Sequence, residues 1–320
     1  MISVSRTYLP PLEEYNKYLK RIWKSNWLTN DGELVRELEK KLQDYWGVKN
    51  VVCVNNGTTA IQIALRAMGI TKKVYMYPNS FVATAEAPAW INIKPVFLDV
   101  NEDLKYPALV THTYGIPHLV PGGPVIYDAS HAFTTKVDGK SVLKYGDVSI
   151  ISFHAVKMFQ TVEGGAVVTD NDVIANKARW MRNHGFKTHY TFYGAGTNAK
   201  MSEFHAAMGL CSLPLVDKMR KKYDELIEKY NTELGLVRVG VSYYPVWYPS
   251  ERKLLKAIKE FEKHDIYPRR YFYPALNKVF GGKPCPLIEE STKRVMCLPL
   301  YYELKDEDQD LIIKIVKETL

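Results

Sequence analysis

The first hundred residues of the chain alternate two patterns of apolar side chains. In one pattern apolar residues recur every three to four positions, which predicts amphipathic helices over residues 10–23 and 33–45. In the other, short apolar runs are continuous, which predicts buried strands over residues 51–54, 74–77 and 95–100. Helices are predicted between these strands, over residues 60–68 and 83–91. This alternation predicts an α/β fold with a mostly parallel sheet flanked by helices.

The alternation is compressed in the next part of the chain. Strands are predicted over residues 108–113 and 125–128, and the short link between them is rich in proline and glycine. Proline inside a helix removes a hydrogen bond and clashes with the preceding turn, so this link cannot form a helix. A parallel crossover normally contains one. If the two strands are parallel neighbours, a loop therefore replaces the covering helix.

The carboxy-terminal part of the sequence has a different pattern of predicted helices and strands. A helix is predicted over residues 173–183, an alanine-rich helix ends near residue 210, and a long amphipathic helix starts at Pro214. Further along, strands are predicted over residues 237–247, 271–274 and 295–300, and helices over residues 251–264 and 306–320. We therefore expect a large domain over residues 1–215 and a small α+β domain over residues 216–320.

The charge balance narrows the class of partner. The chain carries 43 Lys and Arg against 35 Asp and Glu, a net charge of +8, and the basic residues are scattered along it. Such an excess suits an anionic small molecule, such as a phosphorylated cofactor or a nucleotide. Nucleic acid is the competing partner. Because no helix-turn-helix, zinc-finger or RNA-binding signature is present, we expect no nucleic-acid binding.

Cysteine spacing and hydropathy indicate the cellular compartment in which the protein is expected. The four cysteines lie far apart with no ligand spacing, which favours reduced thiols over a disulfide framework or a metal site. No apolar run reaches membrane-spanning length, and the amino terminus has no signal-peptide core. We therefore expect a cytoplasmic protein with no membrane partner and no metal.

Lys157 is the first candidate for chemistry. It stands in a turn between two apolar strand-like runs within residues 149–168. A lysine held close to the core loses hydration, which lowers its pKa and makes its amine nucleophilic. The alternative is a lysine at a loop edge whose charged end reaches water. The turn by itself leaves both interpretations open.

Two further sites follow predicted strands. Gly57 and Thr58 follow the strand over residues 51–54 and open a helix, so free backbone N–H groups and the positive end of a helix dipole meet there. The turn is therefore either an anion site or an ordinary helix cap. Asp128 ends the strand over residues 125–128, where parallel sheets place ligand-binding residues, and His131 follows three positions later. Asp128 is also in the position of a simple helix cap.

Several motifs occur in a characteristic order. They are Asn-Gly-Thr-Thr-Ala at 56–60, Ser-Phe-Val-Ala-Thr at 80–84, Tyr-Asp-Ala-Ser-His-Ala at 127–132, Ser-Phe-His-Ala-Val-Lys at 152–157 with Glu-Gly-Gly at 163–165, and Asn-Ala-Lys-Met-Ser-Glu at 198–203. In this order the chain resembles the DegT/DnrJ/EryC1/StrS family of pyridoxal-phosphate (PLP) sugar aminotransferases. The resemblance implies fold type I, with a mostly parallel seven-stranded sheet flanked by helices and a small carboxy-terminal α+β domain.

The resemblance also implies catalytic roles. Lys157 matches the lysine that carries the cofactor and later moves protons as general base and acid. Asp128 matches the carboxylate that keeps the pyridinium nitrogen of PLP protonated. His131 stands where the family has a glutamine or histidine that hydrogen-bonds the phenolic oxygen of the ring.

The remaining cofactor contacts are implied in the same way. Gly57 and Thr58 match the phosphate site at the helix start, and Ser152 matches a hydroxyl that completes it. Phe81 takes the position of an aromatic side chain that stacks on the ring. Asn198 matches an asparagine that reaches the phosphate from the partner subunit, which implies a homodimer with shared active sites.

Substrate residues rest on the same resemblance. The Glu-Gly-Gly motif that contains Glu163 resembles the motif of members that aminate C4 of a nucleotide-linked 4-keto-6-deoxy sugar, such as dTDP-4-keto-6-deoxyglucose. The same resemblance implies L-glutamate as the amino donor. Arg269 and Arg270 are candidates for binding the nucleotide diphosphate, because guanidinium groups match phosphate oxygens; the alternative is two solvated surface arginines. The family usually has a longer segment, with a helix, where this chain has residues 101–124. The sequence therefore does not determine how this side of the sheet is packed or whether residues 101–124 contact a substrate.

Other functions remain as alternatives at this point. One is a 3-aminotransferase that acts on a 3-keto sugar nucleotide. Another is a regulatory or binding protein that retains the fold without catalysis. A third is the dehydratase branch of the family, which has histidine in place of the lysine, and Lys157 argues against it.

Overall fold

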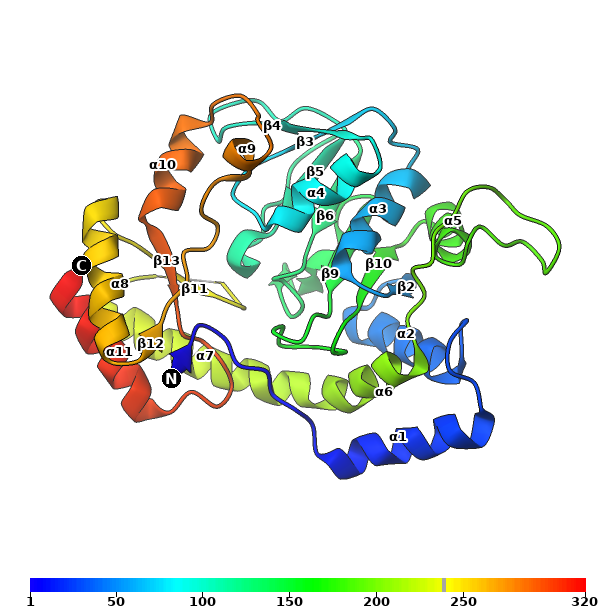
Figure 1. Cartoon of the computed structure of the whole chain (residues 1–320), viewed down its shortest axis with the longest axis horizontal. Helices are drawn as coiled ribbons and strands as arrows, with labels where there is room; N and C mark the ends of the chain where they lie inside the picture. The colour runs from blue at the N-terminus through cyan, green and yellow to red at the C-terminus, as the bar shows by residue number, and fades with distance from the viewer. Residues whose placement is uncertain (238–239) are drawn as a thin grey trace.

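A seven-stranded sheet forms the centre of the molecule (Figure 1), in the strand order β2-β10-β9-β6-β5-β3-β4. The computed structural model describes residues 1–237 and 240–320. The strands are β2 (Asn50–Val54), β3 (Lys73–Met76), β4 (Lys94–Phe97), β5 (Ala108–Thr111), β6 (Val125–Asp128), β9 (Val148–Ser152) and β10 (Gly165–Thr169). β10 pairs antiparallel with β2 and β9, and all other pairs in this sheet are parallel. The predicted mostly parallel seven-stranded sheet is confirmed.

Helices cover both faces of this sheet. On one face, apolar side chains of α3 (Gly57–Ala67), α4 (Val82–Trp90) and α5 (Asp172–Arg182) share a buried core with the central strands. On the other face lies α2 (Glu33–Trp46). The next layers out are α6 (Glu203–Ser212), which packs on α2, and α1 (Leu12–Ser25), which packs on α6. The helices predicted between the strands are therefore present, and they enclose the sheet as its continuous apolar runs require.

The link between β5 and β6 is a loop, as its proline and glycine content predicts. The two strands are parallel neighbours, and a single 3₁₀ turn, Thr113–Gly115, is the helical structure between them. Loop side chains cover the exposed sheet face instead of a helix: Leu119 and Val120, together with Tyr106, pack against buried residues of both strands. The hydroxyl oxygen of Tyr127 accepts a hydrogen bond from the backbone N–H of Val120 at 2.9 Å, which fixes the loop to β6.

The carboxy-terminal part is a mixed α and β region. Its helices are α7 (Val216–Leu234), α8 (Glu251–Lys263), α9 (Leu276–Val279), α10 (Pro286–Arg294) and α11 (Asp306–Thr319), and a 3₁₀ turn, Leu213–Leu215, joins α6 to α7. Strands β11 (Tyr244–Trp247) and β13 (Val295–Leu298) pair antiparallel. β1 (Ile2–Ser3) pairs with β12 (Ile266–Tyr267), so the amino terminus joins this region. A small hairpin of β7 (Lys136–Val137) and β8 (Lys140–Ser141) precedes β9.

Two predicted strands need correction. The strand predicted over residues 237–247 is present at Tyr244–Trp247. Residues 238–239 lie outside the described residues, and residues 241 and 242 form a bend. The strand predicted over residues 271–274 is absent. There the backbone N–H of Tyr271 bonds to the carbonyl of Arg269, and that of Tyr273 to the carbonyl of Arg270, so local turns replace ladder bonds.

The boundary after residue 215 remains a prediction, because one apolar core includes side chains of α2 and α6 together with side chains of α8 and α11. Helices α9 and α10 were not predicted. They lie in a stretch interrupted by glycine and proline, where a periodic pattern is too short to detect.

Glu203 shows how α2 and α6 are joined. Its buried carboxylate accepts hydrogen bonds from the backbone N–H groups of Leu34 and Val35, at 2.8 and 3.0 Å, in the first turn of α2. The N-cap residue of α2, Gly32, has no side chain to do this. A residue distant in sequence therefore caps α2.

Replacing Glu203 with alanine is expected to lower the free energy of unfolding by about 2–4 kcal/mol, because two buried N–H groups lose their acceptor. Urea unfolding followed by circular dichroism measures the change. Glu33→Ala is the matched control, because Glu33 also lies in the first turn of α2 but is exposed and pairs with Arg21 at the surface. A Glu203→Ala variant as stable as the control variant would contradict the capping role.

Candidate active site

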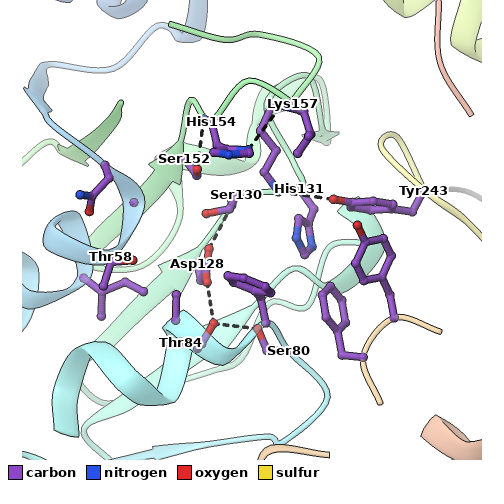
Figure 2. A pocket seen from close by; sticks show the side chains of 18 of the residues that line it. Thr58, Ser80, Thr84, Asp128, Ser130, His131, Ser152, His154, Lys157 and Tyr243 are labelled. Atoms are coloured by element: carbon purple, nitrogen blue, oxygen red, sulfur yellow. Dashed lines mark hydrogen bonds between the residues drawn. The ribbon is translucent and has the colours of Figure 1, made fainter. Parts of the chain in front are cut away.

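A cavity of about 310 Å³ opens at the carboxyl ends of the central strands (Figure 2). Its walls come from the ends of β6 and β9, from the amino termini of α3 and α4, and from turns of the carboxy-terminal region. This is the edge at which open parallel sheets bind ligands. The predicted residues that line it are Gly57, Thr58, Phe81, Asp128, His131, Ser152, Lys157, Glu163 and Arg269.

Asp128 is held at the end of β6 by two donors. Its Oδ2 accepts a hydrogen bond from the Thr84 hydroxyl at 2.9 Å, and its Oδ1 accepts one from the backbone N–H of Ser130 at 3.1 Å. Thr84 in turn contacts the hydroxyl of Ser80 at 2.8 Å, a chain that can be followed in Figure 2. Asp128 is only 6% exposed. These two hydrogen bonds fix the orientation of the carboxylate toward the cavity. Asp128 can therefore contact a ligand there as well as cap the turn that follows β6.

Lys157 lies in the turn after β9 and points into the cavity. Burial lowers the pKa of its amine to about 8, and the nearby Asp128 carboxylate opposes this shift in part. At neutral pH the free-amine fraction is therefore about two to three orders of magnitude larger than for an ordinary lysine. Its Nζ lies 3.4 Å from the hydroxyl oxygen of Tyr243. Of the two interpretations of this lysine, the structure favours the desolvated, nucleophilic one.

His131 faces the same cavity in its neutral form. Burial lowers its pKa well below the usual range, and the positive charge of Lys157 acts in the same direction. Its ring stacks on Phe272 with 5.4 Å between ring centroids and 7° between planes. Within the described part of the chain, its buried Nδ1 has no hydrogen-bond partner. Buried polar atoms are rarely left unpaired, so this atom points to a ligand.

The start of α3 supplies an anion site. The Asn56 side chain caps the helix by accepting from the backbone N–H of Thr59 at 2.8 Å. The N–H groups of Gly57 and Thr58 have no such partner among the described residues, and both residues line the cavity. A Cβ added at Gly57 would lie 2.9 Å from the Cβ of Ser152, so close approach requires glycine there. The turn is thus a cap and an anion site at once.

Three other predicted residues reach the cavity from its rim. Phe81 precedes α4 and is 51% exposed, so its ring is free to cover a bound ligand. Glu163 lies beside His154, with 3.5 Å between Oε1 and Nε2. Arg269 packs over the ring of Tyr271, with 4.9 Å from its guanidinium carbon to the ring centroid.

Two predicted residues lie outside the cavity. The guanidinium of Arg270 donates to the Glu251 carboxylate at 2.6 Å and to the Lys293 carbonyl at 2.9 Å, so it joins structural elements instead. Asn198 accepts a hydrogen bond from Lys200 at 2.6 Å in an exposed segment. The structure therefore separates Arg269 from Arg270 and does not bring Asn198 to the cavity of its own chain.

The sequence interpretation missed the aromatic wall of the cavity. Tyr243, Tyr271 and Phe272 belong to the carboxy-terminal region and close the side that faces His131. The signal for Tyr271 and Phe272 was a dense aromatic run, which was interpreted as a strand. No local signal marks Tyr243, because only the packing of the two regions brings it to Lys157.

Comparison with known proteins decides the family. The model of the DegT/DnrJ/EryC1/StrS aminotransferase family matches residues 12–109 and 121–317. The chain belongs to this family. The interruption in the match covers the end of β5 and the first part of the loop between β5 and β6.

Relatives match this aminotransferase over its whole length. The dTDP-4-amino-4,6-dideoxy-D-glucose transaminase of Shigella dysenteriae is 32% identical over 361 residues, which cover 99% of this chain and 98% of the relative. The Escherichia coli enzyme of the same name is 31% identical, with 99% and 97% covered. The first alignment is longer than this chain, so the relative carries residues that this aminotransferase lacks.

Solved structures agree with this result. DesI, crystallised in the presence of its TDP-sugar product, superposes with a TM-score of 0.92 at 29% identity, covering 99% of this aminotransferase and 92% of DesI. Helicobacter pylori PseC shares the fold at 22% identity, with a TM-score of 0.88 over 99% and 98% of the two chains. The expected aminotransferase fold is thereby confirmed.

The described residues also bear on metals and membranes. They contain no group of three or more His, Cys, Asp or Glu side chains that is placed to hold a metal ion. No helix among them combines the length and the apolar character needed to cross a bilayer.

Proposed function

We propose that this aminotransferase moves an amino group from L-glutamate to C4 of a nucleotide-linked 4-keto-6-deoxy sugar, with pyridoxal phosphate as cofactor. The favoured acceptor is dTDP-4-keto-6-deoxyglucose, and the product is a dTDP-4-amino-4,6-dideoxy sugar. One observation carries the proposal: a desolvated lysine, a fixed carboxylate and a helix amino terminus meet in one cavity. The names of the two bacterial relatives and the TDP-sugar of DesI support the substrate class.

The cavity fits the cofactor at each of its functional groups. The N–H groups at the start of α3 and the Ser152 hydroxyl suit a phosphate. Asp128 suits a protonated ring nitrogen, and the unpaired Nδ1 of the neutral His131 suits a phenolic oxygen. When bound, PLP supplies an aldehyde that exchanges amino groups and a ring that accepts electrons.

Each residue that lines the cavity has a separate role in the proposed reaction. Lys157 would hold the cofactor through its amine and would serve as the base and acid that moves protons at the donor carbon and at sugar C4. Its lowered pKa suits both directions of transfer near neutral pH. Asp128 maintains the positive charge on the ring nitrogen, and Thr84 and the Ser130 N–H keep that carboxylate in place. Phe81 covers the ring and excludes water.

We infer that Arg269 binds the anionic part of a substrate and that Arg270 does not. Arg269 lines the cavity, and within the described residues no carboxylate pairs with it. Arg269→Ala is expected to raise the KM of the nucleotide sugar or of glutamate by about 10–100-fold, as expected for a lost hydrogen bond to a charged group. Steady-state kinetics with each substrate varied in turn identifies which anion it binds.

Arg270→Ala is the matched control. It breaks the ion pair with Glu251, so a small loss of stability is expected, with both KM values unchanged. Equal changes in KM for the two variants would contradict the distinction between these neighbouring arginines.

A homodimer with shared active sites is part of the proposal. The segment that follows α5 extends away from the body of the molecule in Figure 1, and Asn198 pairs with Asn183 where this segment returns. Exposed aromatic residues lie along this segment: Phe186, Tyr190, Phe192 and Tyr193. A partner subunit that covers these side chains would bring Asn198 to its own phosphate site. A monomeric mass in sedimentation equilibrium of the PLP-loaded protein would contradict this arrangement.

A panel of sugar nucleotides tests the function. Purified protein is incubated with PLP, L-glutamate and 4-keto or 3-keto sugars linked to dTDP, UDP or GDP, and products are read by mass spectrometry and NMR. A 4-amino sugar is the expected product, with the highest rate for dTDP-4-keto-6-deoxyglucose. A 3-amino product would support a 3-aminotransferase, and loss of a hydroxyl group would support a dehydratase. If no sugar gives a product, the result would support a regulatory or binding protein.

A further inference from the structure

Tyr243 enters the cavity from the carboxy-terminal region and reaches the amine of Lys157. Its hydroxyl oxygen lies 3.4 Å from Lys157 Nζ, and a dashed line marks this contact in Figure 2. The amine also lies 5.7 Å from the centroid of the tyrosine ring. Among the described residues, no other side chain hydrogen-bonds this amine. The tyrosine and the lysine are 86 positions apart, so this contact depends on how the two regions of the chain pack.

The position of Tyr243 is set by packing that does not involve Lys157. The ring meets His131 edge-on at 4.9 Å and 84°, and meets Tyr271 at 5.0 Å and 69°. The preceding residue, Ser242, donates a hydrogen bond to the backbone carbonyl of His131 at 2.7 Å. Tyr243 is buried, and burial raises the pKa of its hydroxyl above the usual range. The hydroxyl is therefore neutral and fixed against the His131 turn.

We propose that Tyr243 is a positioning residue, which accepts a hydrogen bond from the Lys157 amine and holds it on the His131 side of the cavity. An amine held in this way would stay available for the proton transfer assigned to Lys157. The role in turnover rests on the proposed function, whereas the contact itself does not. No role in the sequence motifs or in the family resemblance assigns this tyrosine.

The contact is tested on the full-length protein freed of PLP. The pH dependence of Lys157 modification by acetic anhydride, read by peptide mass spectrometry, gives the midpoint of its titration. In Tyr243→Phe the ammonium form loses its acceptor, which disfavours the charged state. The midpoint is therefore expected to fall by about one pH unit. An unchanged midpoint would overturn the proposal.

Tyr248→Phe is the matched control. Tyr248 is a buried tyrosine of the same region whose hydroxyl lies 3.2 Å from the Thr319 hydroxyl, away from the cavity. Its replacement is expected to leave the Lys157 midpoint unchanged. If Tyr243→Phe does not fold, incorporation of 3-fluorotyrosine at position 243 keeps the ring packing and weakens the oxygen as an acceptor. A smaller downward shift is then expected, and no shift would overturn the proposal.

Kinetics then separates positioning from structure. Tyr243→Phe is expected to lower kcat by about 10–100-fold, less than the loss of a proton-transfer group itself, and to change both KM values less than twofold. Turnover within twofold of the wild-type protein overturns the positioning role, whichever way the midpoint moves. If the wild-type protein aminates no sugar nucleotide while the midpoint shifts as expected, the proposed function fails and the Tyr243–Lys157 contact stands.

Discussion

Replacing Lys157 with alanine is expected to lower amino-sugar formation by about 10⁴-fold or more. The variant loses the covalent attachment of the cofactor and the group that moves the proton, and positioned acid–base groups alone contribute about 10²–10⁴-fold. The expected loss follows from the site of the lysine, a desolvated amine beside a fixed carboxylate in the cavity. Turnover of dTDP-4-keto-6-deoxyglucose with glutamate measures it.

A second measurement shows whether Lys157 itself carries the cofactor. After borohydride reduction in the presence of PLP, the wild-type protein is expected to carry the cofactor on the peptide that contains Lys157, and Lys157→Ala is expected to carry none. Lys140→Ala is the control, because Lys140 is an exposed lysine of β8 and its loss is expected to leave both results unchanged. Label on another lysine, or residual turnover near the wild-type rate, would contradict the role given to Lys157.

Asp128→Asn is expected to lower kcat by about 10²–10⁴-fold. Breaking one partner of a buried ion pair costs about 3–5 kcal/mol, and that cost applies here when the positive ring nitrogen loses its carboxylate. The amide can keep both neighbours, because its oxygen accepts from the Ser130 N–H and the Thr84 hydroxyl can turn to accept from its NH2 group, so the expected loss is mainly that of charge. Affinity for PLP is expected to change far less than kcat, since the phosphate site is intact.

The electrostatic role of Asp128 can be separated from its packing. A PLP analogue methylated on the ring nitrogen is positively charged without a proton, so it is expected to restore part of the turnover of Asp128→Asn. Asp147→Asn serves as control, because the exposed Asp147 side chain accepts from the Val125 N–H at the opposite end of the same strand. Equal activity of the two variants would contradict the assignment.

Periodic and continuous apolar runs predicted most of the fold because they report burial directly. Strands β2, β9 and β10 of the central sheet are buried on both faces, and such strands appear in the sequence as short apolar runs. The two errors have one physical cause. The aromatic side chains of Tyr243, Tyr271 and Phe272 are apolar in composition, but they line the cavity instead of belonging to a strand.

The candidate site was predictable where one short segment carries the chemistry. Gly57, Asp128 and Lys157 each follow a strand of the parallel sheet, so their convergence follows from the topology. The distinction between Arg269 and Arg270 was not predictable, because it depends on Glu251, a partner from another element. The unpaired Nδ1 of His131 and the approach of Tyr243 are likewise properties of the packed molecule.

The loop between β5 and β6 has a consequence for protein engineering. Surface loops ordinarily accept inserted sequences, because few contacts depend on them. In this chain the Leu119 and Val120 side chains form the cover of the sheet, and Tyr127 fastens them to it. A peptide tag inserted between residues 116 and 121 would displace that cover and expose the strands beneath. A permissive insertion site in this aminotransferase must therefore be sought elsewhere, although the family match is interrupted in this loop.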